Sequence, residues 1–223
     1  MPLILGLLTI ILSYLLGSVP FGLLVVKLAT GKDIRHIESG RTGGTNAMRA
    51  AGFFAGAATA VLDFLKGFCA VWLARWLVPD DVSWRVWIEV LAPLCAILGH
   101  NYSIFLAERT SEGKLRLRGG AGGAPAGGGA AGLWLFSAFI IVPTMMLILF
   151  GIGYASVATM SVGVMSILIF TIRYFYGDSP WEYIMYGVAA EALLVIALQQ
   201  NIKRLMNGTE RLVGWRAKRK KTP

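Results

Sequence analysis

Apolar stretches long enough to cross a lipid bilayer make up most of this chain of 223 residues. A transmembrane helix needs about 20 consecutive, mostly apolar residues. With 56% hydrophobic and only 15% charged residues, the chain has too few charges to cover a soluble domain of this size. We therefore predict an all-α, polytopic integral membrane protein with about seven transmembrane helices. The predicted spans are Pro2–Leu28, Phe53–Val78, Val86–Leu106, Ala124–Val142, Thr144–Gly153, Ala155–Phe175 and Trp181–Leu198.

Lysine and arginine gather in three places: the loop Gly31–Gly52, the loop Ala107–Gly120 and the chain that follows Asn201. The turn Pro79–Arg85 instead carries two aspartates and one arginine. Because loops rich in lysine and arginine stay in the cytoplasm, the three basic regions are predicted to be cytoplasmic. The N-terminus then lies outside, and the C-terminus lies in the cytoplasm.

The number of crossings between the second basic loop and the tail must be even, since both are predicted to lie on the same side. The apolar run from Ala124 to Tyr176 is therefore predicted to divide. Pro143 is the expected break, because proline removes a helix hydrogen bond and clashes with the preceding turn. The predicted organisation is one transmembrane domain, residues 1–202, followed by a basic cytoplasmic tail, residues 203–223.

The formal charge of the chain is +9, from 21 lysines and arginines against 12 aspartates and glutamates. No soluble basic domain remains once the spans are removed, so nucleic acid is not an expected partner. On a hydrophobic chain such a surplus indicates cytoplasmic loops that face anionic lipids, or an anionic substrate.

The first segment that could carry chemistry is Ser39–Arg49, SGRTGGTNAMR. Its glycines permit tightly turned backbone whose N–H groups converge on an anion, and its hydroxyl, amide and guanidinium groups add donors. This is the donor set of a phosphate-binding loop. The alternative is a solvated loop whose arginines only mark the cytoplasmic side. The candidate residues are Ser39, Gly40, Arg41, Gly43, Thr45, Asn46 and Arg49.

Two further segments on the same face have a related composition. The second segment, Arg116–Gly132, offers Arg118 and many glycines as a second phosphate-binding loop. Small residues at this density also let transmembrane helices approach closely. The third segment, Asn201–Gly208, is either part of a site or a basic helix that binds lipid headgroups. A site that joins a phosphate-bearing, water-soluble molecule to a lipid could be built from all three segments.

Three charged residues fall inside predicted spans. Asp63 and Lys66 are three residues apart and share one helix face. Because charges within a membrane are costly and usually paired, a structural ion pair is expected. Glu191 lies at a similar depth on the last span, roughly 15 Å from its cytoplasmic end at about 1.5 Å per residue. We predict that Lys66 bridges Asp63 and Glu191.

The chain resembles the bacterial acyl-phosphate:glycerol-3-phosphate acyltransferase family, called PlsY. The first segment is similar to the family's first motif, which reads roughly S-G-N-x-G-A-T-N-x-x-R. Further similar stretches are LDFLKG at Leu62–Gly67, GHNYSIFL at Gly99–Leu106, YASVATM at Tyr154–Met160 and NIKRLMNGTERLVG at Asn201–Gly214. The resemblance therefore runs over nearly the whole chain.

The resemblance implies a multi-pass, seven-span enzyme of the bacterial inner (plasma) membrane with its motifs in the cytoplasm. It implies acyl transfer from acyl phosphate to glycerol 3-phosphate, which gives lysophosphatidic acid for phospholipid biosynthesis, with no metal or cofactor. The implied catalytic residues are Ser39, Arg49 and Asn201. The implied substrate-binding or phosphate-binding residues are Gly40, Arg41, Gly43, Thr45, Asn46, Arg118, Gly119, Gly120, Gly122 and Arg204.

The chain departs from the family's motifs at several positions. The second motif reads roughly G-G-K-G-V-A-T, so Ala121 stands where a lysine is expected and Pro125 where a threonine is expected. Leu198 stands where the third motif has a histidine, and Arg41 replaces an asparagine of the first motif.

Three hypotheses follow from the resemblance and its departures. The first is an acyltransferase with a rebuilt site, in which Arg41, Lys114, Arg116 or Arg118 replaces the lost lysine. The second is a non-catalytic relative that binds phospholipid or phosphate, or that partners an active enzyme. The third is an unrelated small-solute transporter, which the motif matches argue against.

Overall fold

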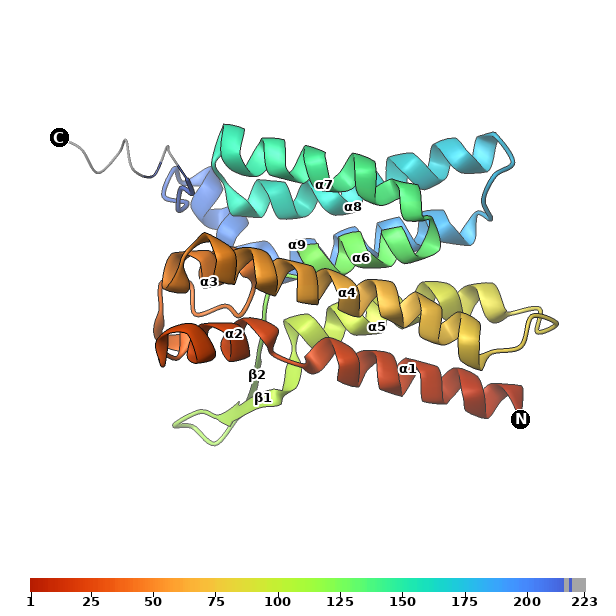
Figure 1. The fold of residues 1–223 in the computed structure, drawn as a ribbon, viewed down its shortest axis with the longest axis horizontal. Helices are drawn as coiled ribbons and strands as arrows, with labels where there is room; N and C mark the ends of the chain where they lie inside the picture. Colours follow the sequence, from red (N-terminus) through yellow and green to blue (C-terminus); the bar gives the residue numbers. More distant parts are fainter. Residues whose placement is uncertain (215–216, 218–223) are drawn as a thin grey trace.

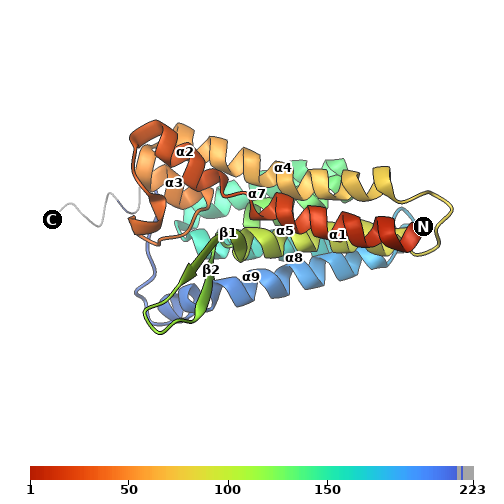
Figure 2. The same ribbon diagram turned by 90° about the horizontal axis from the view of Figure 1, so that it is seen from below.

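The computed structural model describes residues 1–214 and 217. In chain order its elements are α1 (Pro2–Ser18), α2 (Phe21–Thr30), the 3₁₀ turn η1 (Ile34–His36), α3 (Gly44–Ala51), α4 (Phe53–Leu77), α5 (Arg85–Asn101), β1 (Ser103–Arg109), β2 (Leu115–Arg118), α6 (Gly123–Leu133), the 3₁₀ turn η2 (Leu135–Ser137), α7 (Ala138–Leu147), the π-helical turn η3 (Ile148–Ile152), α8 (Ala155–Phe175) and α9 (Glu182–Met206). The long helices lie side by side (Figure 1). The N-terminus lies at the opposite end of this bundle from α3, the β hairpin and the C-terminal segment (Figures 1 and 2).

Five helical stretches of the described chain are long and apolar enough to cross a membrane: Pro2–Thr30, Phe53–Leu77, Leu135–Ile152, Ala155–Phe175 and Glu182–Met206. The helices α5, of 17 residues, and α6, of 11 residues, run beside them (Figure 1). From α6 to α9 the chain runs back and forth along the bundle (Figure 1). Four helices, α6, α7, α8 and α9, follow the hairpin in the described chain.

The predicted break at Pro143 is wrong, because Pro143 lies within α7. The breaks fall instead at Trp134, whose backbone is extended, and at Gly153, which is left-handed with φ of 85°. Membrane helices tolerate proline where nearby side chains satisfy the freed backbone groups. Pro143 removes the hydrogen bond to the Phe139 carbonyl four residues earlier, and in the same turn the Thr144 hydroxyl donates to the Ile140 carbonyl at 2.7 Å. The predicted fifth span is therefore not a separate short helix but part of the helical stretch Leu135–Ile152, of 18 residues, whereas α6 has 11.

The first span bends at Pro20, between α1 and α2. The N–H of Phe21 donates to the Val19 carbonyl at 3.0 Å, so it does not satisfy the Gly17 carbonyl one turn earlier. The ammonium group of Lys66 on α4 donates to that Gly17 oxygen at 3.1 Å. The buried lysine thus satisfies a carbonyl that the bend leaves free.

The predicted ion pair between Asp63 and Lys66 is confirmed, with 2.8 Å between oxygen and nitrogen and both side chains 1% exposed. The predicted bridge from Lys66 to Glu191 is wrong. Glu191 packs against Gly163 of α8, where any larger residue at position 163 would collide with it. Its buried Oε2 atom has no hydrogen-bond partner in the described chain. Lys66 faces Gly17 of α1, whereas Glu191 faces α8, so the two side chains point toward different helices.

The glycine-rich second segment is mostly helix and not a loop, because from Gly123 onward it forms α6. A side chain at Gly67 of α4 would overlap the Pro125 carbonyl oxygen, and one at Gly128 would overlap the Phe64 carbonyl oxygen. The glycines therefore let the backbones of α4 and α6 come into contact.

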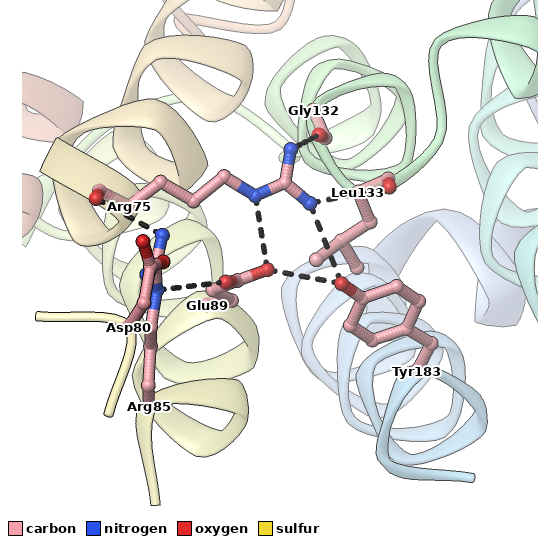
Figure 3. A network of polar contacts seen from close by, with 7 residues as sticks. All are labelled: Arg75, Asp80, Arg85, Glu89, Gly132, Leu133 and Tyr183. Carbon is pink, nitrogen blue, oxygen red and sulfur yellow. Dashed lines mark hydrogen bonds and ion pairs between the residues drawn. The ribbon is translucent and has the colours of Figure 1, made fainter. Parts of the chain in front are cut away.

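The C-terminal end of α6 is capped by Arg75 of α4 (Figure 3). The Arg75 guanidinium donates to the carbonyls of Gly132 at 2.9 Å and Leu133 at 3.4 Å. Glu89 of α5 accepts from Arg75 at 3.0 Å and from the Tyr183 hydroxyl of α9 at 2.9 Å (Figure 3). A helix that ends among other helices within a membrane needs such donors, because lipid chains cannot satisfy its last carbonyls.

The prediction of an all-α fold is wrong in one place. After Asn101 the chain forms an antiparallel hairpin of β1 and β2 (Figure 2). The third span was predicted to continue to Leu106, because the apolar residues of β1 extend the hydropathy of α5. Gly113, with φ of 75°, allows the tight reversal between the strands.

The chain after the last span also differs from the prediction. The helix α9 extends to Met206, into the stretch predicted as a tail. Residues Asn207–Gly214, which we call the strap, then fold back onto the bundle, where the N–H of Val213 donates to the Gly153 carbonyl at 2.8 Å. The basic residues at 216 and from 218 onward lie outside the described residues.

Candidate functional site

A cavity of about 200 Å³ lies among the first segment, the starts of α4, α6 and α8, the end of α9 and the strap. Residues of all three predicted segments reach it, although they are far apart in the sequence. The polar and glycine residues of its lining are Ser39, Arg41, Gly43, Gly44, Thr45, Asn46, Arg49, Gly56, Asp63, His100, Gly122, Gly123, Ser156, Thr159, Asn201, Glu210 and Arg211.

Five predicted site residues do not belong to the cavity lining: Gly40, Arg118, Gly119, Gly120 and Arg204. Arg118 forms an ion pair with Glu108 of the hairpin, and Arg204 forms one with Glu210 at 3.1 Å. Both guanidinium groups are therefore occupied by carboxylates of the chain itself.

The predicted glycines of the second segment support the first segment. The Gly119 carbonyl accepts from the N–H of Thr42 at 3.3 Å. The Gly120 carbonyl accepts from the Arg41 guanidinium at 3.2 Å. A side chain at Gly120 would collide with the imidazole of His100, so a glycine is required there.

Asn46 organises the first segment from its buried position at the start of α3, with 3% of the residue exposed. Its side-chain nitrogen donates to the carbonyls of Arg41 at 2.9 Å and Ile37 at 3.0 Å. Its side-chain oxygen accepts from the N–H of Ser39 at 3.5 Å. One amide thus fixes the backbone on both sides of Gly40.

Arg41 ties the three segments together. Besides the Gly120 carbonyl, its guanidinium reaches the Ala197 carbonyl at 2.5 Å and the Asn201 side-chain oxygen at 3.2 Å. Burial, together with the charge of Arg204, lowers the pKa of Arg41 from its ordinary value. These contacts use most of the directed donors of the guanidinium.

The start of α6 borders the cavity. Gly122 is left-handed, with φ of 87°, and its carbonyl accepts the first helical hydrogen bond, from Ala126 at 2.9 Å. Gly123 and Ala124, the first two residues of the helix, line the cavity. The N-terminus of a helix favours anions because its first N–H groups have no partner within the helix.

Sequence reasoning missed the apolar side of the cavity. This side is formed by Met48, Phe53, Met145, Met146, Leu149 and Phe150. Methionine adapts to irregular apolar ligands because its side chain is unbranched and flexible. No local pattern separates these residues from others that face lipid, so only their shared position in the lining of the folded chain identifies them.

The cavity also reaches the buried ion pair of α4, because Asp63 and His100 belong to its lining. The Nδ1 atom of His100 lies 3.5 Å from the Asp63 carboxylate. Sequence analysis also missed Glu210 and Arg211 of the strap, which line the cavity from the side of α9. Both lie in the stretch Asn201–Gly214, and the similarity of that stretch to the family was the signal that could have found them.

A model of the glycerol-3-phosphate acyltransferase family matches residues 7–208 of the chain. A protein of Dehalococcoides mccartyi named glycerol-3-phosphate acyltransferase 3 is 37% identical over 215 residues, which cover 92% of this chain and 94% of that protein. A protein of Thermus thermophilus named glycerol-3-phosphate acyltransferase is 36% identical over 216 residues, which cover 94% of this chain and 96% of that protein.

Two solved structures have the same fold. One is described as PlsY (YgiH), an integral membrane glycerol 3-phosphate acyltransferase, in its glycerol 3-phosphate form, with a TM-score of 0.76 and 30% identity. The other is described as the lysophosphatidic acid form, with a TM-score of 0.75 and 28% identity. The alignment with the glycerol 3-phosphate form covers 94% of this chain and 96% of that structure's chain. The alignment with the lysophosphatidic acid form covers 94% of this chain and 95% of that structure's chain.

Proposed function

The chain belongs to the glycerol-3-phosphate acyltransferase family, and we propose that it transfers an acyl group from acyl phosphate to glycerol 3-phosphate. A hydroxyl oxygen of glycerol 3-phosphate attacks the acyl carbon, and the bond from that carbon to the phosphate oxygen breaks. The hydroxyl proton leaves with the phosphate. The products are lysophosphatidic acid and inorganic phosphate.

The observation that carries this proposal is the division of the cavity into two chemical halves. One half presents hydroxyls, guanidinium groups and the start of α6, which suit phosphate. The other half presents the side chains of Met145, Met146 and Leu149, which suit an acyl chain. A donor with a phosphate at one end and a hydrocarbon chain at the other matches both halves.

In this proposal Arg49 and the hydroxyls of Ser39 and Thr45 bind phosphate. All three line the cavity, and the side chain of Arg49 makes no ion pair or hydrogen bond with another described residue. Asn201 also lines the cavity, and its side-chain amide donates to the Glu210 carboxylate at 2.9 Å. Asn201 therefore orients the strap as well as the attacking substrate.

Arg41 takes the place of the family's motif lysine in this proposal. Its guanidinium binds the carbonyls of Gly120 and Ala197, which directly precede Ala121 and Leu198. Those are the two positions where the resemblance predicts a lysine and a histidine. A single arginine therefore lies between both missing side chains.

We further propose that the chain is a multi-pass protein of the bacterial plasma membrane, with seven crossings when α5 and α6 are included. The end that carries the cavity, the hairpin and the strap is the cytoplasmic end, where the basic loops favour that orientation and contact with anionic lipids. The N-terminus then faces outward. Both substrates would reach the cavity from the cytoplasmic side.

Purified protein in lipid nanodiscs, supplied with acyl phosphate and radiolabelled glycerol 3-phosphate, tests the proposal. Labelled lysophosphatidic acid is the expected product, in equal amount to the phosphate released. Binding of glycerol 3-phosphate without any product would overturn the acyltransferase assignment. It would favour a non-catalytic phosphate-binding role, in keeping with the absence of polar side chains at Ala121 and Leu198.

A further inference from the structure

Three anchors hold the strap against the bundle and place two of its residues, Glu210 and Arg211, at the cavity. The N–H of Thr209 donates to the Arg204 carbonyl at 2.8 Å, and Val213 is bonded to Gly153. Between these points Glu210 is held by Asn201 and Arg204. Residue 211 therefore has a defined position beside the cavity, although it is exposed on the strap.

Three arginines line the cavity, and they differ in what already binds them. Arg41 is engaged by two carbonyls and an amide oxygen. The guanidinium of Arg49 makes no side-chain hydrogen bond or ion pair with a described residue, although the charges of Glu38, Glu210 and Arg211 act on it. Arg211 has one ion-pair partner, the carboxylate of Glu38 at 4.0 Å, and the two side chains are 41% and 52% exposed. An ion pair this long and this exposed is weak and readily exchanged.

Glu38 has a strained backbone at this point. It has a φ of 48° and is the one non-glycine residue with positive φ in the described part of the chain. This conformation is uncommon for residues with a side chain, and such strain tends to be retained at functional sites. Glu38 directly precedes Ser39, so its strain lies at the edge of the proposed phosphate site.

The charges around Arg49 also favour an anion. Burial lowers the pKa of Arg49, the charge of Arg211 lowers it further, and the carboxylates of Glu38 and Glu210 oppose these effects. Two guanidinium groups thus lie within electrostatic reach of one another. A dianionic phosphate between them would remove their mutual repulsion and accept charge-assisted hydrogen bonds from both.

We propose that Arg211 is an anion-binding residue of the cavity, which pairs with Glu38 when the site is empty and transfers to a phosphate group shared with Arg49 when the site is filled. The identification of that phosphate with one of the two substrates rests on the proposed function. The anion site itself does not, because it follows from the positions of Glu38, Arg49 and Arg211.

The test compares the binding of inorganic phosphate and of glycerol 3-phosphate to the protein in nanodiscs by calorimetry. Arg211→Gln is expected to weaken the binding of at least one ligand about tenfold, because a hydrogen bond to a charged group is lost. Glu38→Gln is expected to tighten it several-fold, because Arg211 no longer has a competing partner. In the double variant the Glu38 substitution should have no further effect.

Lys203→Gln is the matched control, since Lys203 is exposed at the end of α9 close to the strap and the change removes the same charge. It should leave binding unchanged. A thermal unfolding scan checks that each variant is folded. If Arg211→Gln does not fold, the Glu38→Gln result decides, because a failure to tighten binding contradicts the exchange.

Two results would overturn the proposal: unchanged binding in Arg211→Gln, or equal weakening in Glu38→Gln and Arg211→Gln. The second result would show that the pair only supports the strap. A turnover assay on the same samples separates the two proposals. Phosphate binding that depends on Arg211 without formation of lysophosphatidic acid refutes the acyltransferase function and leaves the anion site standing.

Discussion

The ammonium group of Lys66 lies 2.8 Å from the carboxylate of Asp63, one turn away on α4, and both are buried inside the bundle. The lysine also binds the Gly17 carbonyl at the bend between α1 and α2. The aspartate faces His100 and the cavity. The pair therefore joins the first span to the wall of the candidate site.

Lys66→Met should destabilise the protein more than the double variant Asp63→Asn, Lys66→Met. Removal of one partner leaves a buried charge uncompensated, at a cost of about 3–5 kcal/mol, whereas removal of both charges does not. Thermal unfolding in detergent measures the difference. A double variant that unfolds at a lower temperature than Lys66→Met would show that the aspartate has an independent role, through His100.

The cap on α6 gives a second prediction. Arg75→Met should lower the unfolding temperature strongly, because it frees two carbonyls of α6 and removes one of the two guanidinium groups that pair with Glu89, leaving only Arg85 at 3.3 Å (Figure 3). Tyr183→Phe removes one hydrogen bond to Glu89 and should cost only about 1 kcal/mol. Arg116→Met on the exposed hairpin is the control. An equal effect of the tyrosine and arginine substitutions would contradict the capping role.

The contact between α4 and α6 gives a third prediction. Gly128→Ala places a methyl group on the Phe64 carbonyl oxygen, so the two helices must separate. Overpacking of this kind costs about 1–3 kcal/mol or more. Gly151→Ala is the matched control, because a Cβ at Gly151 meets nothing within 4 Å. Unfolding scans of both variants should show a loss only for Gly128→Ala.

Sequence reasoning found the parts of this fold that depend on local composition. Hydropathy identifies the long spans, and charge spacing identifies the Asp63–Lys66 pair, because both depend on neighbouring residues. The rotation of each helix about its axis depends on partners far along the chain, so the Glu191 bridge was predicted wrongly. The apolar residues of β1 look like a continued helix, and only the turn at Gly113 signals the hairpin.

The candidate site likewise contains residues that local composition predicts and residues that only contacts with distant parts of the chain identify. The residues of the first segment were predicted because glycine, hydroxyl and guanidinium groups occur together there. The contact of Arg41 with Ala197 joins positions 156 residues apart, and no local pattern predicts it. The apolar lining was missed because Met146 and Leu149 have the same composition around them as residues that face lipid.

The position of Arg41 gives a fourth prediction. Arg41→Asn should lower kcat/KM about 10²–10³-fold, the effect of removing one preorganised charged donor. Ala121→Lys added to that variant should recover at least about tenfold, since it returns a cation to the same wall of the cavity. Initial rates of lysophosphatidic acid formation measure both. Without any recovery, Arg41 would be an organiser of the loops and not a substitute for the lysine.

The apolar side of the cavity gives a fifth prediction, for the acyl chain. Leu149→Trp fills space beside Met145 and Met146, so long acyl phosphates should lose kcat/KM while short ones keep it. Each methylene excluded from an apolar site costs about 0.8 kcal/mol, so two of them lower kcat/KM roughly tenfold. Leu147→Trp is the matched control, because Leu147 in the same helical stretch, Leu135–Ile152, is 75% exposed and lies outside the lining. A series of acyl phosphates of increasing length separates the variants. If Leu149→Trp lowers the rates of all lengths equally, the acyl chain does not occupy this side of the cavity, and the two-halved cavity would no longer support a lipid-chain donor.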